Sequence, residues 1–134
     1  MYQRIVVPID LAHADKAPEM ISTAHKLAEP SAEIWLIHAI EALPGYASAH
    51  VPGGVIESSR DEARKELEHL AGEIDADVEV RDGRAPTVIL DFADEKDADV
   101  IVIASHKPDL RDYFLGSTAA SVVRHAQCSV LVLR

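Results

Sequence analysis

The hydrophobic positions along the chain alternate between short continuous runs and segments with helical spacing. Continuous apolar runs are typical of strands that are covered on both faces. The first run should end near Pro8, which has no N–H to donate to a sheet. Residues 76–81 alternate with period two, which predicts an edge strand with one more exposed face. The pattern therefore predicts five strands, over residues 4–9, 33–40, 76–81, 99–104 and 129–133.

Between these runs, apolar residues recur three and four positions apart, as they do in amphipathic helices. Pro30 ends the first helical pattern, and Pro86 suits the first turn of the third. Residues 42–55 carry prolines and glycines without any periodicity, which predicts a long surface loop. The expected helices cover residues 17–28, 56–74, 86–93 and 116–126.

Strands that alternate with helices in this way predict right-handed crossovers and a mostly parallel sheet, hence an α/β fold. The chain has 134 residues, which fits one domain over residues 1–134. In such a sheet, ligands bind beyond the carboxyl ends of the strands, where the strand order reverses. Turns and loops around Asp10, His38, Gly83 and Ser105 follow strand ends, so we expect them to meet at one edge.

Composition narrows the range of partners. The chain has 13 Lys and Arg against 23 Asp and Glu, a formal net charge of −10, which opposes general attraction to nucleic acid or anionic membranes. The single Cys128 allows no disulfide within the chain and suits a small buried hydrophobe better than a reactive thiol. With no signal peptide or membrane-spanning run, we expect a cytoplasmic protein. The scattered histidines have no metal-ligand spacing, so we expect no metal site. We expect no catalytic residue either, and His38, at the end of a buried strand, suits a hydrogen-bonded core or rim position better than a catalytic role.

The loop after the fourth apolar run, residues 99–104, has the highest concentration of polar side chains that could bind a ligand. Ser105, His106 and Lys107 follow the strand, and Gly116, Ser117 and Thr118 open the last helix. Free N–H groups and the positive dipole end of a helix attract anions, and glycine lets a phosphate approach the backbone. The alternative is a plain helix start in which Ser117 is the N-cap. Neither standard phosphate-loop motif is present.

The chain resembles the universal stress proteins, a Rossmann-like group of nucleotide-binding proteins, over nearly its whole length. The motifs that carry this resemblance are Ile5-Val6-Val7-Pro8-Ile9-Asp10, Leu36-Ile37-His38-Ala39-Ile40, Gly83-Arg84-Ala85-Pro86, and Leu115-Gly116-Ser117 with the segment down to Val132. Family members that bind ATP typically carry Gly-x-x-Gly before the Gly-Ser pair. Here Ala104 stands at the first glycine and the second is absent. The loop is similar to that of a subgroup with Ser-His-Arg/Lys-Pro-Asp.

The resemblance implies an open parallel five-stranded sheet of order 3-2-1-4-5 with helices on both faces. It also implies a site for ATP, ADP or AMP, with or without Mg²⁺ carried by the nucleotide. Asp10 would lie against the ribose or base, Ala39 would present its backbone to the adenine edge, and Gly83 would leave room beside the base. The expected nucleotide-binding residues are Pro8, Ile9, Asp10, His38, Ala39, Ile40, Gly83, Ala104, Ser105, His106, Lys107, Gly116, Ser117 and Thr118.

Two classes of function follow. The first is a regulatory or stress-response protein that binds an adenine nucleotide and has little or no catalytic activity, because no general base is evident. The second is a nucleotide-independent dimer that acts through protein contacts. A nucleotide-handling enzyme is a weaker alternative, since the signatures for such chemistry are missing. The apolar strand Ser129–Leu133 invites pairing with a second copy, so we expect a homodimer through it.

Overall fold

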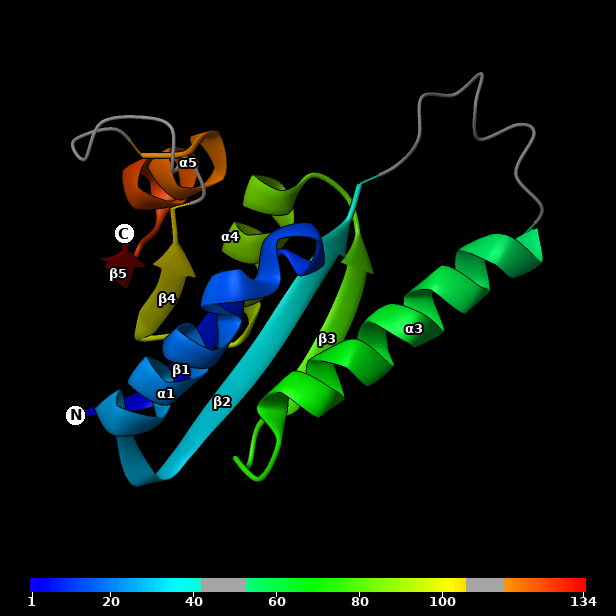
Figure 1. Ribbon diagram of the computed structural model, residues 1–134. Helices are drawn as coiled ribbons and strands as arrows, with labels where there is room; N and C mark the ends of the chain where they lie inside the picture. The colour runs from blue at the N-terminus through cyan, green and yellow to red at the C-terminus, as the bar shows by residue number, and fades with distance from the viewer. Residues whose placement is uncertain (42–52, 106–114) are drawn as a thin grey trace.

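The computed structural model describes residues 1–41, 53–105 and 115–134, and within them a five-stranded parallel sheet with helices on both faces (Figure 1). The strand order is β3-β2-β1-β4-β5, as expected. His106 and Lys107, which the sequence assigned to the site, lie outside the described residues. The strands are β1 (Tyr2–Pro8), β2 (Ala28–Ile40), β3 (Asp77–Asp82), β4 (Val100–Ala104) and β5 (Ser129–Leu133).

Strand β1 lies at the centre of the sheet because both its faces and both its edges are covered. It pairs with β2 from Arg4 opposite Glu33 to Pro8 opposite Ile37, and with β4 through Ile5 opposite Val100. Ile5 and Val7 face one hydrophobic core, and Val6 faces the other. This is why the first run of the sequence is apolar from Ile5 to Ile9.

The helices divide between the two faces of the sheet. Helices α1 (Ala17–Leu27) and α3 (Gly53–Ala71) cover one face, with Met20 and Leu67 fully buried against it. Helices α4 (Ala85–Glu95) and α5 (Ser117–His125) cover the other face, where Phe92 and Val122 are fully buried. None of the helices in the described part of the chain is long and apolar enough to cross a membrane.

Three details differ from the sequence prediction. Strand β2 begins at Ala28 rather than Glu33 and includes Pro30. The pairing shifts register between Tyr2 and Arg4, and such an irregularity accommodates a residue that cannot donate. Helix α3 begins at Gly53, inside the segment expected to be a loop. A short 3₁₀ helix, η1 (Leu11–Lys16), follows β1 and was not predicted.

Phe92 is the largest of the fully buried side chains in the described part of the chain. Its ring is fully buried and meets Trp35 edge-to-face at 6.1 Å between centroids. We expect Phe92→Ala to lower the free energy of unfolding by about 3–5 kcal/mol, because it leaves a cavity as well as losing apolar burial. Urea denaturation measures this change. Thr87→Ala, at an exposed position of the same helix, is the matched control and should change stability by less than about 0.5 kcal/mol. A comparable loss in both variants would contradict this account.

Candidate functional site

A cleft of about 300 Å³ opens at the carboxyl ends of β1, β2 and β4, on the α4 and α5 side of the sheet. This is the point where the strand order reverses, because the chain leaves β1 toward β2 and later returns to β4 on its other side. The lining residues come from three strand ends and two helices: Pro8, Ile9, Asp10, Ile37, His38, Ala39, Glu41, Ala85, Ile89, Ile103, Ala104 and Thr118.

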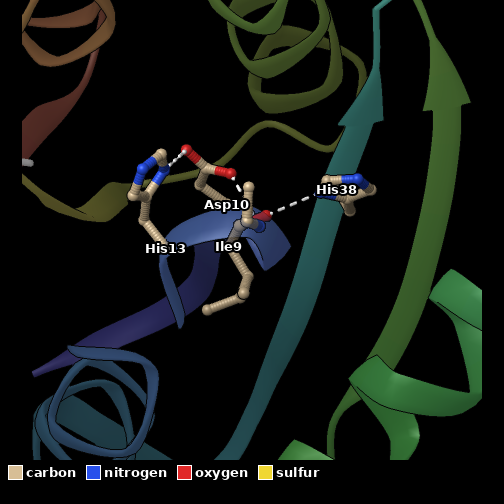
Figure 2. Close-up of polar contacts among 5 residues, drawn as sticks. Ile9, Asp10, His13 and His38 are labelled. Carbon is tan, nitrogen blue, oxygen red and sulfur yellow. Dashed lines mark hydrogen bonds and ion pairs between the residues drawn. The ribbon is translucent and has the colours of Figure 1, made fainter. Parts of the chain in front are cut away.

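At the end of β1, the Asp10 carboxylate makes hydrogen bonds within the turn that follows it. One oxygen accepts from the N–H of Ala12 at 3.0 Å and so caps η1, and the other lies 3.1 Å from Nδ1 of His13 (Figure 2). The side chain is still 46% exposed. Asp10 therefore presents a fixed, negatively charged acceptor beside the cleft.

At the end of β2, His38 bonds back to the β1 turn. The N–H of Ile9 donates to the carbonyl of Ile37 at 2.8 Å, which is the last step of the β1–β2 ladder. The carbonyl of Ile9 then lies 2.9 Å from Nδ1 of the His38 ring (Figure 2). Because a carbonyl can only accept, Nδ1 must carry the hydrogen. His38 is thus a hydrogen-bonded histidine at the rim of the site, as its position in the sequence indicated.

The backbone of Ala39 faces the cleft. Backbone N–H and C=O groups alternate between the two edges of a strand, and the Ile37 carbonyl faces β1. Ala39, two residues on, faces the same way, where β1 has already ended. The backbone groups of the alternate residues His38 and Ile40 face β3, as the bond from the Gly83 N–H to the Ile40 carbonyl shows. Side chains alternate between the faces of the sheet, so the Ile40 side chain packs against the α1 and α3 core and does not line the cleft.

Gly83 supports the cleft from behind rather than lining it. Its φ of +139° is one that only glycine adopts readily, and a Cβ there would lie 2.9 Å from Cγ2 of Val88. Two residues later, α4 begins, with Ala85 in the wall of the cleft. The glycine is therefore required by the turn into α4, a more local reason than the room beside a base that the resemblance implied.

On the opposite side of the cleft, the end of β4 is tied to the start of α5. The Ser105 N–H donates to the carbonyl of Leu133, and its hydroxyl oxygen accepts from the N–H of Gly116 at 3.0 Å. Gly116 is the N-cap of α5, so the alternative in which Ser117 is the N-cap is wrong. The N-cap glycine has no side chain of its own to cap the helix, so within the described residues the Ser105 hydroxyl is the side-chain group that bonds to the helix start, and Thr118 from the first turn lines the cleft. Gly116 has an ordinary φ of −62°, so its backbone conformation does not require glycine.

Glu41 is a residue of the cleft that the sequence analysis missed. It follows β2 immediately, and its carboxylate accepts from the N–H of Ala85, 3.4 Å away, at the start of α4. Its position directly after a central strand, where polar residues can reach the cleft, could have identified it from the sequence. Among the described residues, no group of three or more His, Cys, Asp or Glu side chains is placed to hold a metal ion.

Cys128 lies in a separate shallow hollow at the far end of α4, with Asp94 and Asp97. Burial raises the pKa of its thiol, and nearby Asp94 and Asp99 raise it further. A raised pKa keeps the thiol protonated and unreactive at neutral pH, which agrees with the structural role expected from the sequence.

The fold and the cleft define a doubly wound α/β protein with a cleft at its topological switch point, the place where such folds bind ligands. The model of the universal stress protein family matches residues 1–134. The chain therefore belongs to the universal stress protein family.

Known proteins are similar to this chain over almost its whole length. Universal stress protein G of Salmonella typhimurium is 34% identical over 145 residues, which covers 100% of both chains. A solved structure of a protein described as hypothetical shares the fold, with a TM-score of 0.81 at 22% identity over 99% of this chain and 96% of the other. The crystal structure of a universal stress protein in complex with cAMP is 25% identical, with a TM-score of 0.64 over 99% of this chain and 97% of that one.

Gly83→Ala tests the turn that carries α4. We expect the variant to lose about 1–3 kcal/mol of stability from backbone strain, and more from the contact with Val88. Gly72→Ala is the control: its φ of +59° is also left-handed, but nothing lies within 4 Å of the added Cβ, so it should lose only about 1–2 kcal/mol. Urea denaturation of both variants, and of Gly83→Ala combined with Val88→Ala, separates strain from contact. Equal losses at both glycines would show that the contact is unimportant.

Proposed function

We propose that the cleft binds an adenine nucleotide and that the protein acts as a nucleotide-responsive regulatory or stress-response protein. The observation that carries this is the division of polar groups between the two sides of the cleft. Carboxylates and backbone edge groups lie at the ends of β1 and β2, and an uncapped helix start lies beyond β4. A nucleotide has the matching division, with amino and hydroxyl donors at one end and phosphate oxygens at the other.

The β1 and β2 side fits a base and a ribose. Ala39 offers one N–H and one C=O along an edge of backbone that β1 leaves open, which complements the ring nitrogen and amino group of adenine. Asp10 keeps a half-exposed carboxylate that can accept from a ribose hydroxyl. The cleft volume of about 300 Å³ is at the lower end for ligand pockets, enough for a small ligand that extends outward.

The α5 side fits the phosphates. The N-cap glycine provides no side-chain cap, and apart from the Gly116 N–H, which Ser105 accepts, no bond to the N–H groups of the first turn is seen within the described residues. Thr118 of that turn lines the cleft, so the positive dipole end of α5 lies at the cleft. Since glycine is not needed at residue 116 for its φ, room for a phosphate oxygen is a sufficient reason for it. Lys107 remains an expected phosphate contact outside the described residues. Mg²⁺, where present, would arrive with the nucleotide. The relative that binds cAMP supports an adenine ligand.

Calorimetric titration with ATP, ADP and AMP in the presence of Mg²⁺ tests the proposal. We expect binding to the wild-type protein, and a loss of about tenfold or more in Gly116→Val, because its branched side chain blocks a charge-assisted hydrogen bond. Gln127→Val, beyond the other end of α5, is the control and should bind as the wild type does. If none of the three nucleotides binds at millimolar concentration, the proposal fails and the nucleotide-independent alternative takes its place.

We also propose a homodimer through β5, which serves either alternative. The two edges of the sheet differ in character: β3 exposes Asp77 and Asp82, whereas β5 exposes Leu131, which is 36% accessible. Charged edges resist pairing and apolar edges favour it. The Leu133 carbonyl faces β4, so the N–H groups of Val130 and Val132 point to the open edge and are available to a second copy.

Val130→Pro should abolish the dimer and leave the monomer folded, because the lost N–H belongs to the open edge. Leu131→Pro is the contrasting variant: its N–H faces β4, so we expect it to destabilise the fold itself. Light scattering gives the mass of each variant, and circular dichroism gives its folded content. A folded dimer of Val130→Pro would contradict the proposed interface.

A further inference from the structure

We propose that His38 is a positioning residue for the base. Its ring donates a hydrogen bond to the Ile9 carbonyl, so the β1–β2 ladder of backbone hydrogen bonds ends one step before Ala39. The N–H and C=O of Ala39 are thereby left for a ligand. This inference rests on the nucleotide site proposed above, although its structural half can be measured without any ligand.

The evidence is the sequence of bonds at the end of the ladder. In a parallel pair, the Ile9 N–H donates to Ile37, and the next bond in register runs from the Ala39 N–H to the Ile9 carbonyl. In the structure, that carbonyl accepts instead from Nδ1 of His38, at 2.9 Å. Figure 2 shows this bond between the His38 ring and Ile9. The ring belongs to the residue next to Ala39, so one side chain replaces the backbone donor of its own neighbour.

The bond matters because the site is partly buried. A buried backbone carbonyl without a partner is costly, so an Ile9 carbonyl without the His38 ring would favour a bond from the Ala39 N–H that completes the ladder. With the ring in place, Ala39 presents a donor followed by an acceptor along the open strand edge. Adenine offers the complementary pair, N1 as acceptor and its 6-amino group as donor. A ladder extended to Ala39 would remove the donor that N1 needs.

Amide hydrogen exchange of the ligand-free protein tests the structural half. The probe is the Ala39 N–H, and the Ile37 N–H, which lies within the ladder, is the internal reference. We expect the Ala39 N–H to be unprotected in the wild type. In His38→Leu it should exchange about two- to tenfold more slowly, the effect of one added backbone hydrogen bond. His38→Asn is the matched control, because its Nδ2 stands two bonds from Cβ as Nδ1 does, and it should restore the wild-type rate.

Titration with AMP and with ribose 5-phosphate tests the binding half. His38→Leu should weaken AMP about two- to tenfold, the effect of losing one hydrogen bond to the base. Ribose 5-phosphate has no base, so its affinity should not change. A merely structural histidine would weaken both ligands alike or neither. His38→Asn should again resemble the wild type.

Several results would overturn the inference. One is an Ala39 N–H as protected as that of Ile37 in the wild type, which would mean that the ladder continues. Another is an equal loss of AMP and ribose 5-phosphate affinity in His38→Leu. If AMP does not bind the wild type at all, the proposed function fails, and the base-positioning role fails with it. The exchange rates still decide whether His38 ends the ladder, so the two failures are distinguishable.

Discussion

The pairing of β1 with neighbours on both edges is the constraint on which the rest of the structure depends. Because β1 lies between β2 and β4, the chain must leave it in one direction and return on the other, and the connections diverge at its carboxyl end. Side chains cannot close the space between diverging connections completely. The cleft is therefore a consequence of strand order, and the residues at three strand ends become its lining.

The difference in length between neighbouring strands decides the chemistry of that cleft. Strand β2 runs to Ile40, whereas β1 stops at Pro8, so the backbone groups of Ala39 that face the β1 side have no strand beside them, although β3 pairs with β2 on the other side. Nearby carboxylates are used to hold turns: Asp10 caps η1, and Glu41 accepts from the start of α4. These bonds fix the negative side of the site in place, while the uncapped start of α5 supplies the positive side.

Much of the fold follows from the sequence, because hydrophobic periodicity reports local burial directly. Five strands, the four main helices and the edge position of β3 were all predicted from it, and the strand order from family resemblance. The prediction failed where non-local pairing overrides local preference. Pro30 lies inside β2 because a register shift against β1 accommodates it, and Gly53 begins α3 although glycine favours loops.

For the site, the sequence by itself determined which strand ends carry polar groups, since an aspartate or a histidine at or near the end of an apolar run is visible in the pattern. It identified Asp10, His38 and Ala39, all of which line the cleft. Only the tertiary structure decided which of their atoms are available. The Gly116 cap, the withdrawal of Gly83 and Ile40 from the cleft and the inclusion of Glu41 depend on bonds between residues far apart in the chain. Hydrogen-bond partners across a sheet are set by register, which a single strand's sequence does not contain.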